Sequence, residues 1–228
     1  DGVATSPDLN SLHWNPAKYA FIEKEMGLSV SYTPWLNNLV DDIHLAYITG
    51  YNRLDREQVI SGSLLYFSLG DIIFRNEFGT YNGQHTPYEL ALDAAYSRKF
   101  GERFSGGIAF RYIRSDITGG AYLQGGTESK AGNSVAADVS MYYHNPGISF
   151  QDKEMDFSLG MNIRNIGAKI EYTTIKKNFI PTTLKLGTAF NFHLDEYNSL
   201  MFTTDLNKLL VPTPPHYYQD STDENGDP

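Results

Sequence analysis

Long segments in which apolar and polar residues alternate place the strongest constraint on how this chain can fold. Successive side chains of a β-strand point to opposite faces, so alternation at period two predicts strands with one apolar face. A tilted membrane strand needs about 9–11 residues, whereas strands of globular proteins cluster at about 5–6. Segment length therefore favours an all-β, antiparallel transmembrane β-barrel over a soluble β-sandwich. We predict ten strands: GLSVSYTPW, IHLAYITGYN, QVISGSLLYFS, DIIFRNEF, LALDAAYSRK, GIAFRYIRS, VAADVSMYY, FSLGMNIR, TLKLGTAFNFHL and SLMFTTDLN.

The two faces of these segments differ in charge. The apolar faces carry no charged residue until Arg114, at a strand end. A charged side chain that faces lipid at the bilayer midplane costs about 2–4 kcal/mol, so an uncharged face is what lipid selects. In a β-sandwich the polar faces would instead meet outside water. We expect the charged residues of the opposite faces to line a hydrated lumen: Asp93, Arg111, Asp138, Arg164, Lys185 and Asp205.

The connections between segments favour the barrel. Short turns such as FGERF and LDEYN alternate with longer polar loops such as TGGAYLQGGTESKAGNS, which is the pattern of outer-membrane barrels. In IHLAYITGYN the apolar face comprises Ile43, Leu45, Tyr47 and Tyr51, whereas QVISGSLLYFS is apolar on both faces and its register stays open. Aromatic residues near strand ends are expected to form the interfacial girdles: Tyr32, Trp35, Tyr51, Tyr96, Phe100, Tyr142 and Tyr143.

Composition and motifs exclude several classes of function. The net charge of −9 argues against a nucleic-acid partner, which would need a basic patch. The chain has no cysteine, which removes disulfides and thiolate chemistry. The motifs of serine hydrolases, zinc proteases and nucleotide-binding proteins are missing, and the six histidines are scattered. We therefore predict no catalytic residues, no metal site and no cofactor, and we interpret the inward charges as structural.

A turn precedes the first predicted strand at Trp14, Asn15, Pro16 and Ala17. Proline fixes φ near −65° and removes a backbone donor, and an asparagine before it favours a turn. A compact segment of this kind can plug a lumen, and an ordinary turn before a strand has the same sequence. The residues alone leave both interpretations open.

A family resemblance favours the plug. The Trp14–Ala17 turn before the first strand resembles the N-terminal hatch of FadL-type outer-membrane barrels. The chain is similar to the PorV family of the type IX secretion system along nearly its whole length. The segments that carry this similarity are GVATSPDLNSLHWNPAKYAF, SYTPWL, YFSLGDI and VPTPP. The resemblance implies a fourteen-stranded FadL-type barrel, of which about ten strands are present here. It divides the chain into a hatch at 1–25, an incomplete barrel at 26–210 and an extracellular loop at 211–228, after which we expect the closing strands to be missing.

The resemblance also implies a function in the outer membrane of a Gram-negative bacterium. It implies a carrier that collects secreted cargo from a very large translocon barrel, holds its C-terminal signal domain and passes it to a sortase-like attachment complex. Outer-membrane lipid would surround the barrel. The long loops at 118–134 and from residue 212 onward are the expected docking rim. The alternative is a FadL-like transporter of hydrophobic small molecules, which would need a continuous apolar path; Gly62, Gly106 and Gly107 are candidate strand kinks for it.

Overall fold

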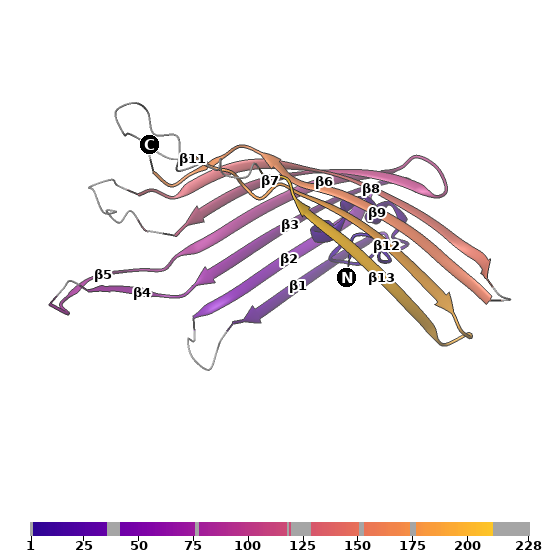
Figure 1. Cartoon of the computed structure of the whole chain (residues 1–228), viewed down its shortest axis with the longest axis horizontal. Helices are drawn as coiled ribbons and strands as arrows, with labels where there is room; N and C mark the ends of the chain where they lie inside the picture. Colours follow the sequence, from indigo (N-terminus) through magenta and orange to yellow (C-terminus); the bar gives the residue numbers. More distant parts are fainter. Residues whose placement is uncertain are drawn as a thin grey trace, which may run out of the picture.

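A nine-stranded antiparallel sheet makes up most of the molecule (Figure 1). The computed structural model describes residues 2–35, 42–75, 78–117, 119, 129–150, 153–173 and 177–211. No helix among these residues is long and apolar enough to cross a membrane. The strands of the sheet are β1 (Met26–Pro34), β2 (Ile43–Arg53), β3 (Gln58–Leu69), β6 (Tyr88–Lys99), β7 (Phe104–Asp116), β8 (Gly132–Phe150), β9 (Lys153–Gly167), β12 (Thr183–His193) and β13 (Ser199–Leu209).

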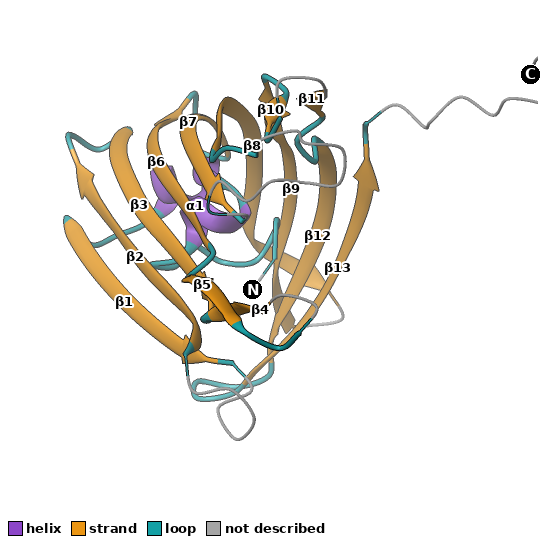
Figure 2. Ribbon diagram, turned by 90° about the vertical axis from the view of Figure 1, so that its left-hand side faces the viewer, coloured by secondary structure: helices purple, strands orange, loops and turns teal. Residues whose placement is uncertain are grey.

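The strands follow one another as a meander, because each strand between β1 and β13 pairs with the one before it and the one after it in the order given. The all-β prediction is thus confirmed. Within the described residues, β1 and β13 each pair on one side only, so a closed barrel and its strand number stay predictions. The sheet is strongly curved, and the N-terminal residues lie inside the curve, with α1 (Ser11–Trp14) and the 3₁₀ helix η1 (Pro16–Phe21) (Figure 2).

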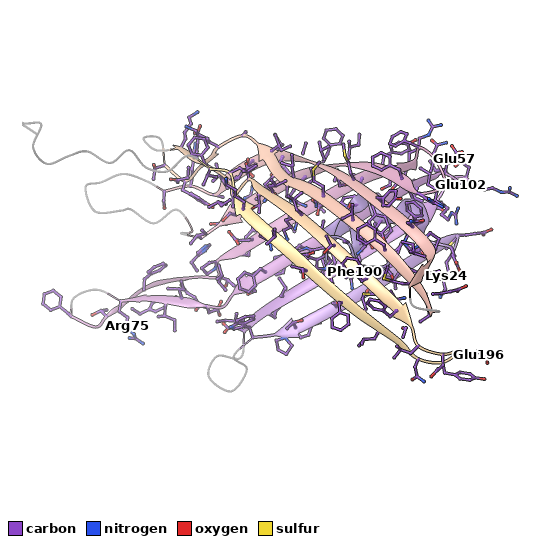
Figure 3. The ribbon with its side chains drawn as sticks, turned by 45° about the vertical axis from the view of Figure 1, so that its right-hand side comes forward. Lys24, Glu57, Arg75, Glu102, Phe190 and Glu196 are labelled. Carbon is purple, nitrogen blue, oxygen red and sulfur yellow. The ribbon has the colours of Figure 1, made fainter. Side chains whose placement is uncertain are left out.

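The two rims of the sheet differ in their connections. Few residues join β2 to β3, β6 to β7, β8 to β9 and β12 to β13, and we call this the short-turn rim. Longer segments, 35–42, 70–87, 117–131 and 168–182, connect the strands at the opposite, long-loop rim. Figure 3 shows Lys24, Glu57, Glu102 and Glu196 at the short-turn rim and Arg75 at the far end. This asymmetry is the one expected of an outer-membrane barrel.

One predicted strand of the ten lies outside the sheet. The segment DIIFRNEF supplies β4 (Ile72–Arg75), which pairs with β5 (Tyr81–His85) in a separate hairpin. The β3–β6 ladder closes where Leu69 N donates to Pro87 O at 3.0 Å, and the positive φ of Gly70 turns the chain outward there. The hairpin projects from the long-loop rim (Figure 1). A second short hairpin joins β10 (Ile170–Glu171) to β11 (Lys177–Asn178).

The convex face of the sheet is an exposed apolar surface. Strand pairing aligns one apolar row across five strands: Ile48, Leu64, Leu92, Tyr112 and Val135. The pairing of Ile60 with Tyr96 and of Leu64 with Leu92 also fixes the register of β3, which its sequence leaves open. Side chains that exclude water in a soluble core are instead on the outside here.

The sequence prediction is wrong for the apolar face of β2. Leu28 pairs with Gly50 and Val30 with Ile48, so the even-numbered residues of β2 share the convex face with the apolar side of β1. Ile43, Leu45, Tyr47 and Tyr51 consequently lie on the concave face, where Tyr51 is buried. Two of them contact the N-terminal residues: Tyr47 lies against His13 and Tyr51 against Tyr19.

Candidate functional site on the concave face

The N-terminal segment, residues 2–25, lies against the concave face near the short-turn rim, and its middle is buried. The Asn15 side chain accepts a hydrogen bond from Ala17 N at 3.1 Å and so caps η1, with Pro16 at the first helical position. Proline is favoured there because the first helical N–H has no partner in the helix. The Asn-Pro pair therefore starts the helical turn that fits inside the sheet.

Hydrogen bonds join this turn to several strands of the sheet, among them β6, β7 and β8. Asn15 Nδ2 donates to Met141 O on β8 and to Val3 O, each at 2.9 Å. Ser97 on β6 and Ser105 on β7 donate to the carbonyls of Pro16 and Ala17, each at 2.7 Å. The Asn15 amide thus uses both of its donors and its acceptor. Side chains of the sheet thus supply hydrogen-bond partners for the buried backbone carbonyls of the turn, as buried polar groups require.

Three glycines on the concave face allow the N-terminal backbone to approach the sheet. A Cβ atom at Gly107 would lie 2.8 Å from Ala17 N. A Cβ at Gly160 would collide with the carbonyl of Val3, and one at Gly187 with the Asp205 carboxylate. Any larger residue at these positions displaces the segment or the strand.

A buried lysine connects the helical turn of the N-terminal segment to the first residues of the same segment. Lys18 Nζ donates to Gly2 O and to Thr5 Oγ1, each at 3.1 Å, and the side chain is fully buried. Burial lowers the pKa of Lys18 to about 8, although Asp8 and Asp205 act in the opposite direction. An ammonium in this position is stable only because its donors are hydrogen-bonded.

The segment also packs apolar side chains on the sheet. Leu12 and Tyr19 form the main buried cluster with four residues of the wall: Tyr51, Val59, Ala95 and Ala109. The ring centroids of Tyr19 and Tyr51 are 5.2 Å apart. This cluster is the largest apolar core of the described molecule, so the fold of the sheet depends on the segment inside it.

The segment reaches both ends of the open sheet. Val3 N donates to Asp205 Oδ2 on β13 at 3.0 Å. At the other end Leu9 packs so closely on Gly27 of β1 that a Cβ there would collide with it. The first and last strands are therefore connected through residues 3–9 although they do not pair with each other.

Four of the six predicted inward charges form one network nearer the long-loop rim. Arg111 Nε lies 2.6 Å from Asp93 Oδ1, and Arg111 Nη2 lies 3.1 Å from Asp138 Oδ2. Arg164 Nε lies 3.4 Å from that same Asp138 oxygen. The network has two acids and two bases, spans β6 to β9 and is nearly closed to solvent. In such a balanced, buried set each charge has a partner of opposite sign, and the set cross-links four strands of the sheet.

A bulge in β9 completes this network. Ala137 pairs with Ile166 and Val139 with Ile163, so Asp138 faces both Arg164 and Asn165. Asn165 has φ 57°, in the left-handed region that asparagine tolerates better than most residues. Its backbone N donates to Asp138 Oδ1 at 2.8 Å. The bulge thereby turns both residues toward one carboxylate.

The other two predicted charges contact the N-terminal segment. Lys185 Nζ lies 4.9 Å from the centroid of the Trp14 ring, and Asp205 accepts from Val3 N. Burial, and then the cations Arg164, Lys185 and Arg111, lower the pKa of His13 to about 4. All six predicted residues are thus on the concave face, in two groups rather than one.

Sequence reasoning missed several residues of this site. Lys18 has no motif around it, and its burial depends on Gly2 and Thr5, which are distant in sequence. Among the described residues, no group of three or more His, Asp or Glu side chains is placed to hold a metal ion. The predicted docking loop lies outside the described residues at 118 and 120–128, as do residues 212–228.

Two rows of aromatic residues border the convex surface. Near the long-loop rim, ring centroids are 5.4 Å apart for Tyr32 and His44, 6.0 Å for His44 and Tyr66, and 5.8 Å for Tyr66 and Tyr88. Near the short-turn rim the row consists of Tyr96, Phe100, Phe104 and Tyr143. Tyr51 and Tyr142, predicted for these girdles, are instead buried against the N-terminal segment, so that prediction was wrong for both.

The spacing of the two rows can be compared with the thickness of an apolar membrane band. Tyr88 and Tyr96 are on the same face of β6, eight residues apart. At about 3.4 Å per residue this is roughly 27 Å along the strand. With a strand tilt of about 35–45° the two rows are about 19–22 Å apart across a membrane, slightly less than the apolar band of about 25 Å in outer-membrane barrels.

The protein is all-β. It is a curved antiparallel meander with an apolar outer face and its own N-terminal segment on the inner face. The family model of the type IX secretion system protein PorV matches residues 1–216. The chain therefore belongs to the PorV family and is a component of the type IX secretion system, which confirms the resemblance in its sequence. Comparison with curated proteins gave no significant match.

Proposed function

We propose that this chain forms the wall of a FadL-type barrel in the outer membrane that carries secreted proteins and has no enzymatic activity. In this proposal it binds the C-terminal signal domain of a cargo protein, collects the cargo from the large translocon barrel and delivers it to the sortase-like attachment complex. The proposal rests on membership of the PorV family and on one observation: the apolar face is outside, while the chain's own N-terminal segment lies inside the curve of the sheet.

The polar contacts on the concave face favour a carrier over a small-molecule transporter. A transporter needs a continuous apolar path, but the concave face contains the buried network around Arg111 and the hydrogen-bonded turn at Asn15. Gly107, a candidate kink, contacts the N-terminal segment instead of opening the wall. A hydrophobic ligand that crossed the interior would have to displace the Arg111 network and the hydrogen bonds of the Asn15 turn.

We assign part of the cargo contact to the β4–β5 hairpin, which projects from the long-loop rim (Figure 1). Ile72, Ile73 and Tyr81 are exposed there. An isolated two-stranded hairpin is marginally stable in water, and exposed apolar groups outside a membrane mark interaction sites. The longer loops of outer-membrane barrels face the cell exterior, so cell-surface partners could reach this rim.

The test is a mild-detergent purification of the full-length protein with mass spectrometry of the co-purifying proteins. We expect a very large barrel and secreted proteins that share a C-terminal β-sandwich. The double variant Ile73→Ser, Tyr81→Ser should reduce cargo recovery several-fold. The matched control is Tyr197→Ser, since Tyr197 is 91% exposed on the short-turn rim. Recovery of the barrel alone with bound fatty acid would contradict the carrier function.

A further inference from the structure

Arg114 is the charged residue that interrupts the apolar alternation of β7, and the concave-face network does not use it. It lies on the convex face, because it pairs with Leu90 and follows Phe110 and Tyr112 on the same side of the strand. Charges on the outer surface of a membrane wall are costly near the midplane but tolerated at the interfaces. Arg114 lies next to Tyr88 in the aromatic row near the long-loop rim, which would be such an interface.

The guanidinium of Arg114 is held in a defined orientation. Its Nε donates to Tyr88 Oη at 2.9 Å. Tyr112, two residues before it, has its own hydroxyl bonded to Asn133 Oδ1 at 2.7 Å. Tyr88 in turn stacks on Tyr66. Tyr112 also contacts the guanidinium, and the donors that Tyr88 and Tyr112 leave unused are available to an oxyanion.

No carboxylate among the described residues forms an ion pair with Arg114. The acid two residues further along β7, Asp116, is paired with His85 at 3.3 Å and accepts from Gly119 N. The surface next to Arg114 toward the short-turn rim is apolar, including Leu92, Phe110 and Ile108. A cation at one end of an apolar strip matches an amphiphile with an anionic headgroup.

We propose that Arg114, oriented by Tyr88, binds the headgroup phosphate of a lipid in the leaflet at the long-loop rim, with the acyl chains along β6 and β7. This inference rests on the proposed membrane location. The phosphate takes the terminal nitrogens of the guanidinium, because Arg–phosphate pairs are strong, charge-assisted hydrogen bonds. Tyr88 is a positioning residue, since it acts through Arg114.

The test uses native mass spectrometry of the full chain in mild-detergent micelles that contain equal amounts of phosphatidic acid and diacylglycerol. The two lipids have identical acyl chains and differ only in the phosphate. We expect the wild-type protein to retain phosphatidic acid about tenfold over diacylglycerol, and Arg114→Gln to abolish this preference. Tyr88→Phe should weaken it while the cation remains, and Arg114→Lys should restore only part of it.

The matched control is Lys208→Gln. Lys208 is also an exposed cation on the convex face near the long-loop rim, but no described hydroxyl orients it. We expect this variant to keep the wild-type preference, and an unchanged preference in Arg114→Gln would overturn the proposal. Displacement of phosphatidic acid by millimolar inorganic phosphate would overturn the lipid assignment in favour of a soluble anion. A wild-type protein that retains neither lipid would contradict the membrane location itself, whereas equal retention of both would contradict the phosphate site alone.

Discussion

The carbonyl of Val3 occupies the space next to Gly160 that the Cβ of any other residue would need. This contact couples the first residues of the chain to β9, far along the sequence. The N-terminal segment is therefore part of the folded wall and not an appendage. Substitutions on the concave face of the sheet should consequently act through the segment.

Gly160→Ala is expected to displace the N-terminal segment. The added methyl group collides with backbone, which cannot move aside as a flexible side chain can, and overpacking of this kind costs about 1–3 kcal/mol. Limited proteolysis should cut within residues 2–25 faster than in the wild-type protein. Gly101→Ala is the control, because a Cβ there meets nothing within 4 Å. Equal cleavage of both variants would show that the segment is not seated on β9.

Asn15→Asp is expected to destabilise the fold by on the order of 3 kcal/mol. The variant keeps the oxygen that caps Ala17 but replaces an amide that donates to Val3 O and Met141 O. A buried carboxylate would then face two carbonyl oxygens. Denaturant unfolding measures the loss. Asn133→Asp, at an exposed amide, should cost far less, and a similar loss in both would contradict the assigned bonds.

The buried network predicts a large difference between two arginines. Arg111→Gln leaves Asp93 and Asp138 without their main partner, and removing one member of a buried pair costs about 3–5 kcal/mol. Arg98→Gln breaks only an exposed pair with Glu57, which is worth about 0–1 kcal/mol. Unfolding free energies of the two variants should therefore differ by several-fold. Equal losses would mean that the network is accessible to water.

His13 predicts a loss of stability in acid. Its folded-state pKa is about 4, below the ordinary 6.5, because of burial and the nearby cations Arg164, Lys185 and Arg111. The unfolded chain therefore binds the extra proton first, and stability that is present above pH 6.5 falls as the pH drops from 6.5 toward 4. His13→Phe should remove this part of the pH dependence. Unfolding midpoints at pH 7 and 4.5 measure it, and an identical pH dependence in the variant would refute it.

The strands were predictable from sequence because alternation at period two is a local property. Alternation separates two faces but does not say which one points outward, and this is why Tyr51 was placed on the wrong side. Its orientation depends on Tyr19, which packs against it from the N-terminal segment. The residues Ile72–Arg75 alternate too, but they form a short strand outside the main sheet, because the chain turns away from the β3–β6 ladder at Gly70.

For the concave-face site, the sequence predicted which kinds of residue point inward but not all of the contacts between them. Charges on the inward faces, such as Asp93 and Arg111, follow from the alternation, and their pairing follows from cross-strand register. The bulge at Asn165 depends on a carboxylate from another strand and a positive φ, neither of which has a local signal. Lys18 is buried by residues at the start of the chain. Long-range packing, not local propensity, decides these features.

The proposed membrane wall requires the convex face to meet lipid, and a direct test is simple because the chain contains no cysteine. Single cysteines at Leu92, Ala94 and Ala91 can be labelled with an environment-sensitive fluorophore in outer membranes. Leu92 and Ala94 lie on the convex face of β6, whereas Ala91 lies on the concave face. We expect blue-shifted emission that brominated lipid quenches at positions 92 and 94, and neither effect at 91. Water-like emission at all three positions would contradict the membrane wall.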